Sequence, residues 1–134
     1  MQAELANDLR SAAVGQIAIR VHDLPRSTAF YRDVLGLRLL FEAEGRMAFF
    51  DCGGVRLMLS LPEPEFDHPP SIVYFRVADI GATYETLKSR GVVFRDAPHL
   101  IADLGTHELW MAFFEDAEGA VLALMSERPK ALVR

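Results

Sequence analysis

The sequence has one cysteine, no run of basic residues and no long apolar segment. Cys52 cannot form an internal disulfide, and its apolar neighbours favour a small buried residue over a nucleophile. The net charge of −5 at pH 7 offers no basic surface to nucleic acid or to an anionic membrane. No segment approaches the ~20 apolar residues of a membrane-spanning helix, and MQAELANDLRSAA at the start lacks the pattern of a signal peptide. We therefore expect a cytoplasmic protein whose partner is neither nucleic acid nor a membrane.

The residues from Gln16 to Val21 alternate in character, which is the period of a half-buried strand. One face carries Ile17, Ile19 and Val21, and the other carries Gln16, Ala18 and Arg20. Asp23 is placed to cap a helix that Pro25 can open and Gly36 can end. Residues 37–41 then leave as a second strand.

The same order restarts at Ser71, with Asp79 as the helix cap and Gly91 as the helix end. The two caps lie 79 − 23 = 56 residues apart. Each unit then closes with a hairpin of similar sequence, AFFDCGGVRLML at 48–59 and AFFEDAEGAVLALM at 112–125. The sequence therefore predicts two βαβββ modules.

The predicted fold is α+β, with the two βαβββ modules forming a curved mixed sheet around a cleft. The 134 residues suit one domain of residues 14–128, with modules at 14–62 and 71–128. Residues 1–13 are an N-terminal extension, either an extra helix or partly disordered, and residues 129–134 are a tail. The segment LPEPEFDHPP at 61–70 holds four of the seven prolines and is a stiff connector between the modules. Residues 97–105 are expected to form a loop or an irregular edge.

This order of elements, with the phrases DLPRSTAFYRDVLGL and FFEDAEGAVLALM, resembles the vicinal oxygen chelate superfamily. That superfamily includes glyoxalase I, extradiol dioxygenases, methylmalonyl-CoA epimerase, and the bleomycin and fosfomycin resistance proteins. The resemblance covers residues 14–127 and implies the glyoxalase/bleomycin-resistance fold. It implies no single function, because members include isomerases, lyases, oxygenases, transferases and proteins that only bind a drug.

The resemblance also implies where a divalent metal would be held in catalytic members: at the start of the first strand and in the last strand of each module. The matching positions here are Gln16, Met58, Ile72 and Ala123. Only Gln16 offers a usable donor atom, and a shift of one residue adds only Ser71. The four histidines, His22, His68, His99 and His107, show no ligand spacing on one element. We expect no cofactor, and a divalent metal is disfavoured.

Strand parity predicts a ligand-binding face. The cleft face carries Gln16 and Arg20 in one module, Tyr74 and Arg76 in the other, and Met58 in a last strand. Such a face is apolar with two cations at equivalent positions, and a pair of guanidinium groups suits a carboxylate or phosphate. The alternative is that both arginines lie near strand ends and pair with acids such as Glu42 or Glu115.

The strand that contains Trp110 adds two predicted ligand-binding residues, Trp110 and Glu108. Pairing across the turn at 116–119 puts Trp110 on the cleft face with Ala123, whereas the one-residue difference between the hairpins reverses that parity. His107 and Glu108 form the polar end of this strand, and because they are adjacent at most one enters the cleft. The alternative for these two residues is a solvated pair at the edge of the sheet.

Three classes of function fit these observations. The favoured class is a metal-free binding protein, similar to the bleomycin resistance proteins, for a small apolar or aromatic ligand with an acidic group. The second is a metal-dependent lyase, isomerase or dioxygenase with displaced ligands. The third is a metal-independent lyase or isomerase that uses Glu108 or His107 as acid or base. Apolar cleft faces would be exposed in a single chain, so we also expect a homodimer in which both halves complete each cleft.

Overall fold

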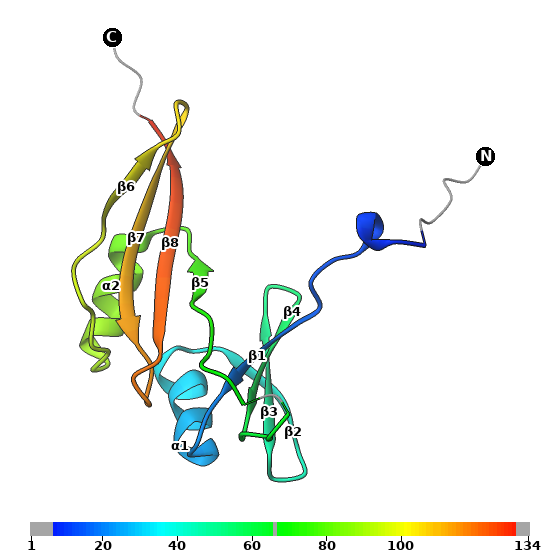
Figure 1. Ribbon diagram of the computed structural model, residues 1–134. Helices are drawn as coiled ribbons and strands as arrows, with labels where there is room; N and C mark the ends of the chain where they lie inside the picture. The colour runs from blue at the N-terminus through cyan, green and yellow to red at the C-terminus, as the bar shows by residue number, and fades with distance from the viewer. Residues whose placement is uncertain (1–6, 66, 131–134) are drawn as a thin grey trace.

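The computed structural model describes residues 7–65 and 67–130, which form two four-stranded sheets with a helix on one face of each (Figure 1). The first module contains β1 (Gln16–Arg20), α1 (Leu24–Ala29), a π-helical turn (Phe30–Val34), β2 (Arg38–Ala43), β3 (Met47–Cys52) and β4 (Val55–Ser60). The second contains β5 (Val73–Arg76), α2 (Ile80–Ser89), β6 (His99–Asp103), β7 (His107–Glu115) and β8 (Val121–Pro129). The α+β architecture predicted from two βαβββ units is therefore confirmed.

The two sheets have the same topology. Their strand orders are β1-β4-β3-β2 and β5-β8-β7-β6, and in each sheet the first two strands are parallel. Ala18 pairs with Met58 in the first sheet, as Tyr74 pairs with Ala123 in the second. Equivalent residues of the two modules lie 74 − 18 = 56 positions apart in the first strands and 123 − 58 = 65 positions apart in the last strands. The modules are thus matched residue by residue.

Each helix begins where the sequence predicts. The Asp23 carboxylate accepts a hydrogen bond from the N–H of Arg26 at 3.1 Å, and the Asp79 carboxylate accepts one from the N–H of Ala82 at 3.0 Å. These caps satisfy backbone donors that have no partner inside the helix. Gly91, which follows α2, has a φ of +90°, a conformation that suits glycine.

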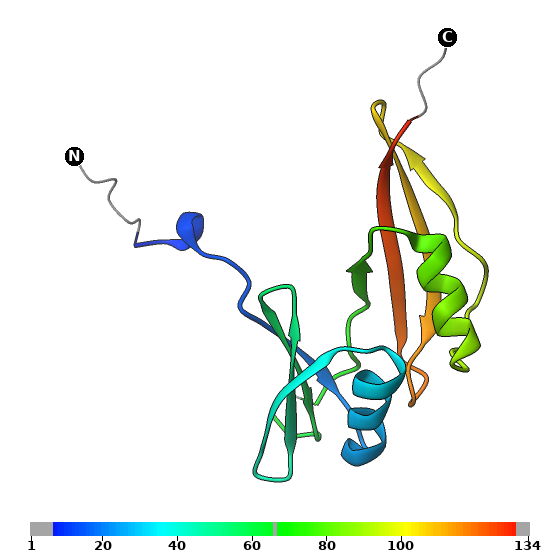
Figure 2. The same ribbon diagram turned by 180° about the vertical axis from the view of Figure 1, so that it is seen from behind.

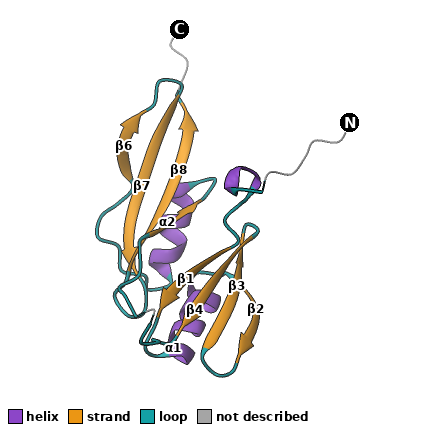
Figure 3. Ribbon diagram, turned by 45° about the vertical axis from the view of Figure 1, so that its right-hand side comes forward, coloured by secondary structure: helices purple, strands orange, loops and turns teal. Residues whose placement is uncertain are grey.

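The core lies between each helix and its sheet, and Figure 3 draws the two helices in purple and the strands in orange. The largest buried side chains of the two sheets are Ile19, Phe50, Leu57 and Leu59 in the first, and Phe114 and Leu122 in the second. Seen from behind, α2 covers one face of β7 and β8 (Figure 2). The opposite face of each sheet carries no helix, and we call it the open face.

Two segments refine the sequence prediction. Residues 99–103, expected within a loop or irregular edge, form the edge strand β6, whose register shifts between Leu100 and Ala102, so the irregular edge is the alternative that the structure shows. That shift breaks the alternation that would have revealed a strand. At the C-terminal side, β8 continues to Pro129, and Lys130 pairs with Asp103 at 2.8 Å, so the segment expected as a tail begins inside the sheet.

Residues 7–13 of the N-terminal extension lead away from the first module (Figure 1). Its described part holds a short 3-10 helix, Leu9–Ser11, and residues 7–13 are all exposed. The predictions for residues 1–6 and 131–134 fall outside the described residues. Within residues 7–65 and 67–130, no helix is long and apolar enough to cross a membrane.

Candidate functional site

A cavity of about 390 Å³ lies against the open face of the first sheet, and we call it the Arg20 cavity. Its apolar walls are Ala18, Met47, Met58, Leu61 and Pro62, and its polar walls are Arg20, Ser60, Glu63 and His68. The strand register explains the grouping, because Ala18 pairs with Met58 and Arg20 pairs with Ser60. Paired residues on neighbouring strands point to the same face of a sheet.

The proline-rich connector forms one wall of this cavity. Leu61 donates its N–H to the carbonyl of Arg46 at 3.0 Å, and the Arg46 guanidinium donates to the carbonyl of Pro62 at 3.0 Å. These bonds hold the start of the connector against the turn between β2 and β3. The connector therefore encloses the cavity as well as joining the modules.

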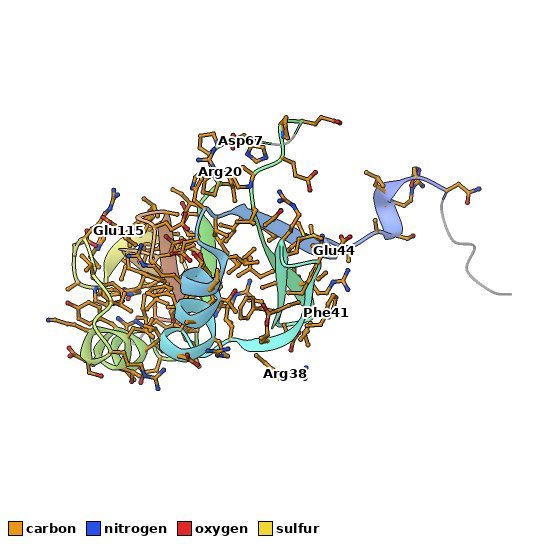
Figure 4. All side chains as sticks on the ribbon, turned by 90° about the horizontal axis from the view of Figure 1, so that it is seen from below. Arg20, Arg38, Phe41, Glu44, Asp67 and Glu115 are labelled. Carbon is orange, nitrogen blue, oxygen red and sulfur yellow. The ribbon has the colours of Figure 1, made fainter. Side chains whose placement is uncertain are left out.

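Arg20 is the one cation of the predicted binding face that lines this cavity. Its Nη1 donates to the Asp67 carboxylate at 2.6 Å, and Figure 4 shows the two side chains together. The side chain is 26% exposed, and its buried Nε has no hydrogen-bond partner in the part of the chain that the structure describes. The alternative that Arg20 pairs with an acid of the same chain is thus confirmed, but the acid is Asp67 and neither of the examples Glu42 and Glu115, and Glu115 pairs with Arg95 at 3.5 Å.

Gln16 and Met58 lie together, as strand parity predicts. The Gln16 side-chain amide donates to the Met58 sulfur at 3.7 Å. Met58 lines the Arg20 cavity, while Gln16 is exposed beside it. The first module thus gathers three of the predicted binding residues on its open face.

The second module does not contribute to this cavity. Tyr74 lies on the open face of the second sheet, 44% exposed, with its ring edge-on to Phe113 at 6.0 Å between centroids. Arg76 is exposed as well. Every wall residue of the Arg20 cavity comes from the first module or the connector. The joint cleft expected between the two modules is therefore not formed by these walls in a single chain.

A family model for the Glyoxalase/Bleomycin resistance protein/Dioxygenase superfamily matches residues 13–124 of this chain. The chain belongs to this superfamily. The uncharacterized protein YraH of Bacillus subtilis (strain 168) is 31% identical over 98 residues, which cover 63% of this chain and 77% of that protein. Metallothiol transferase FosB of Staphylococcus haemolyticus is 31% identical over 70 residues, which cover 49% of this chain and 50% of that enzyme. The chain thus spans about half the length of FosB.

Solved structures of this superfamily share the fold. A member from Sphaerobacter thermophilus DSM 20745 superposes with a TM-score of 0.74 at 24% identity, covering 86% of this chain and 97% of that chain. Lactoylglutathione lyase from Agrobacterium tumefaciens superposes with a TM-score of 0.71 at 21% identity, covering 86% and 93%. The resemblance to the vicinal oxygen chelate superfamily is confirmed at the level of the fold.

The superfamily's metal positions do not supply a metal-binding set in this member. Met58 contacts Gln16, Ile72 is 42% exposed and apolar, and Ala123 is buried between Tyr74 and Phe113. In the described ranges, no group of three or more His, Cys, Asp or Glu side chains is placed to hold a metal. Divalent ions of this kind need carboxylate, imidazole or thiolate donors, so these residues do not fit one.

The register of β7 and β8 overturns the placement of Trp110 on the face of Ala123. Phe113 pairs with Ala123, so Trp110 lies on the opposite face, packed against the core. Its indole N–H donates to the Glu108 carboxylate at 3.2 Å, and the Arg128 guanidinium lies 4.2 Å from the ring centroid. Neither Trp110 nor Glu108 lines the Arg20 cavity. The one extra residue in the β7–β8 turn causes this reversal of parity.

Proposed function

We propose that this superfamily member binds a small molecule with an apolar body and one acidic group in the Arg20 cavity, without a metal. The observation that carries the proposal is the composition of the walls, in which apolar side chains stand beside one guanidinium group, that of Arg20, and the other polar walls are Ser60, Glu63 and His68. A cavity of about 390 Å³ falls in the size range of small-molecule sites.

The acidic group follows from the state of Arg20. A largely buried guanidinium group is expensive to leave unpaired, and Asp67 contacts it through only one nitrogen. A carboxylate can accept two parallel N–H bonds from guanidinium. Asp67 is 44% exposed on the connector, so a ligand carboxylate can exchange with it by a small movement of that segment.

A second copy of the chain completes the site in this proposal. The open faces leave Phe41, Ile72 and Tyr74 between 42% and 45% exposed. Large exposed apolar side chains on a face that carries no helix favour association. The open face of a partner's second module would cover the Arg20 cavity and remove these side chains from water.

The two enzyme alternatives draw less support from the residues. A metal-dependent activity is suggested by the similarity to metallothiol transferase FosB, and a lyase activity by the similarity to lactoylglutathione lyase, but the donor set does not fit a metal. A metal-independent lyase or isomerase would need His107 or Glu108 near a ligand. Their side chains contact Thr106 and Trp110 instead, and neither lines the Arg20 cavity.

The test compares matched ligands that differ in one group. A panel of aromatic carboxylic acids and their primary amides is titrated against EDTA-treated protein by calorimetry. The proposal predicts that at least one acid binds about tenfold or more tightly than its amide, which is ~1.4 kcal/mol. Equal affinity for acids and amides throughout the panel would remove the role of Arg20 in recognition.

A further inference from the structure

The two modules contact each other through two related surfaces, and one of these contacts is filled by side chains. There, the β7–β8 turn reaches the start of α1. The buried Tyr31 hydroxyl donates to the Asp116 carboxylate at 2.8 Å. The Glu118 carboxylate accepts hydrogen bonds from the N–H groups of His22 and Asp23 at 2.8 and 2.7 Å. The Ser27 hydroxyl also donates to Glu118, at 3.3 Å.

The second contact has the same plan with different side chains. The offset of 56 residues makes Leu87 the counterpart of Tyr31 and Thr83 the counterpart of Ser27. Phe49 pairs with Met58 and Phe113 pairs with Ala123, which are equivalent residues of the two last strands. Phe49 and Phe113 lie 113 − 49 = 64 residues apart, and the same offset makes Cys52 the counterpart of Asp116. The last strands differ by 65, so one extra residue lies in the β7–β8 turn. Glu118 lies in that turn, and the shorter β3–β4 turn, with Gly53 and Gly54, has no acid in its place.

A cavity of about 240 Å³ remains at this second contact, and we call it the Leu87 cavity. Its walls include Leu35, Cys52, Phe75, Arg76, Thr83 and Leu87. It lies where leucine replaces tyrosine and cysteine replaces aspartate. The unfilled space is therefore the consequence of these two replacements and of the missing counterpart of Glu118.

Two backbone hydrogen-bond donors lie next to this cavity. The N–H groups of Ala78 and Asp79 correspond to those that bind Glu118, and neither has an acceptor among the described residues. Both residues are exposed and neither is a wall of the cavity; they lie in the chain between Val77 and Thr83, which both line it. Arg76 forms no ion pair in the described part of the chain. These donors all suit an anion.

One carboxylate already lines the Leu87 cavity, but it is engaged elsewhere. Asp51 accepts a hydrogen bond from the N–H of Gly54 at 3.4 Å and lies 3.6 Å from the Arg38 guanidinium.

At the filled contact, partial burial acts to raise the pKa of Glu118, yet the N–H groups of Asp23 and His22 outweigh burial and lower it below the ordinary value. A site of this plan thus holds its acid in the ionised form.

We propose that the Leu87 cavity binds a small monocarboxylate whose apolar body is about the size of one ring. The carboxylate takes the place of Glu118, accepting from the N–H groups of Ala78 and Asp79 and from the Thr83 hydroxyl. The apolar body fills the space that the Tyr31 ring occupies in the other contact, against Leu87. This site is separate from the Arg20 cavity and does not depend on the function proposed for it.

The test is a titration of the full chain, labelled with ¹⁵N, with sodium benzoate, followed by amide chemical shifts. We expect saturable shifts at Ala78, Asp79 and Thr83 with a Kd on the order of 1 mM. The amides of His22 and Asp23 are the internal control, because Glu118 already occupies them. Benzyl alcohol, which has the ring without the charge, should bind at least about tenfold more weakly.

A double variant fills the cavity with the side chains that fill the other contact. Leu87→Tyr with Cys52→Asp reproduces the Tyr31–Asp116 pair and should weaken benzoate at least about tenfold. Thr83→Val, which keeps the shape and removes the hydroxyl, should weaken it about threefold and serves if the double variant does not fold. Arg10→Ala, at a residue that pairs with Asp8 and lines neither cavity, should leave these shifts unchanged. Absence of shifts at Ala78 and Asp79, or equal shifts with benzyl alcohol, would overturn the proposal.

Discussion

At the scale of single residues, the charge of Arg20 decides what its cavity can bind. The guanidinium group is three-quarters buried against apolar walls, and Asp67 contacts one of its nitrogens. Among the described residues, Arg20 is the arginine that lines the cavity, and its removal takes this cation away. The preference for an acidic ligand should therefore depend mainly on the Arg20 side chain.

Arg20→Ala should weaken binding of an acidic ligand by about 10- to 100-fold, at ~1.4 kcal/mol for each tenfold, and should leave the neutral amide nearly unaffected. Calorimetric titration of the two ligands measures both effects. Arg32→Ala is the matched control, because Arg32 is exposed and pairs with its neighbour Asp33 at 2.8 Å. Similar losses for acid and amide would mean that Arg20 acts through packing alone.

The hydroxyl of Tyr31 contributes to the stability of the fold. Burial, and then the negative charge of Asp116, raise the pKa of Tyr31 above its ordinary value, so the phenol remains a donor. Tyr31→Phe leaves the buried Asp116 without this donor and should lower the free energy of unfolding by about 1.5–3 kcal/mol. Urea denaturation measures the change. Tyr84→Phe, on α2, should stay within about 0.5 kcal/mol, and equal losses from both variants would contradict this assignment.

At the scale of elements, turns and connectors carry what differs between the modules. The β7–β8 turn supplies Glu118 to the start of α1, where the carboxylate accepts from backbone N–H groups at the positive end of the helix. The shorter β3–β4 turn supplies no acid to α2, which leaves the Leu87 cavity. One additional residue in a turn therefore separates a filled contact from an open one.

Glu118 should make stability depend on pH. Its pKa is lowered in the folded protein, so its contribution is present above the ordinary value of 4.5 and is lost as the pH falls through the folded pKa. Glu118→Gln should reduce the free energy of unfolding by about 1 kcal/mol at neutral pH and should flatten its decline in acid. Urea denaturation between about pH 3 and 7 measures both curves. Parallel curves for the variant and the natural protein would contradict this role.

Local sequence patterns predicted these elements to different degrees. The alternation from Gln16 to Val21 and the caps at Asp23 and Asp79 predicted strand and helix starts correctly, because these signals depend on neighbouring residues. The strand β6 was predicted only as a loop or an irregular edge, since its register shift and exposed Leu100 hide the alternation. The face of Trp110 depends on one residue in a turn, which periodicity does not fix.

The candidate site was predicted in part. Strand parity brought Gln16, Arg20 and Met58 together on one open face. The partner of Arg20 was missed, because Asp67 lies in a connector without a periodic pattern and 47 residues away in sequence. Contacts such as that of Glu118 with His22, 96 residues apart, depend on how the modules pack and leave no local signal.

At the scale of the whole molecule, the duplicated plan leaves two open faces with exposed apolar side chains. If a second copy covers the Arg20 cavity, the protein should be a homodimer at micromolar concentration by light scattering. Tyr74→Arg, on the open face of the second sheet, should shift it toward the monomer, because the change places a charge among apolar side chains. Glu85→Lys on exposed α2 should leave the dimer unchanged. A monomeric natural protein would contradict shared completion of the cavity.

The central claim is that this member of the superfamily binds an acidic, largely apolar molecule through Arg20 without a metal. Native mass spectrometry of the protein as purified, paired with elemental analysis, tests it most directly because mass, metal and bound molecule are read together. The account predicts a dimer with no stoichiometric zinc, nickel, iron or manganese, and any molecule released on denaturation should carry a carboxylate or phosphate. About one tightly bound divalent metal per chain would contradict it and would favour a metal-dependent activity instead.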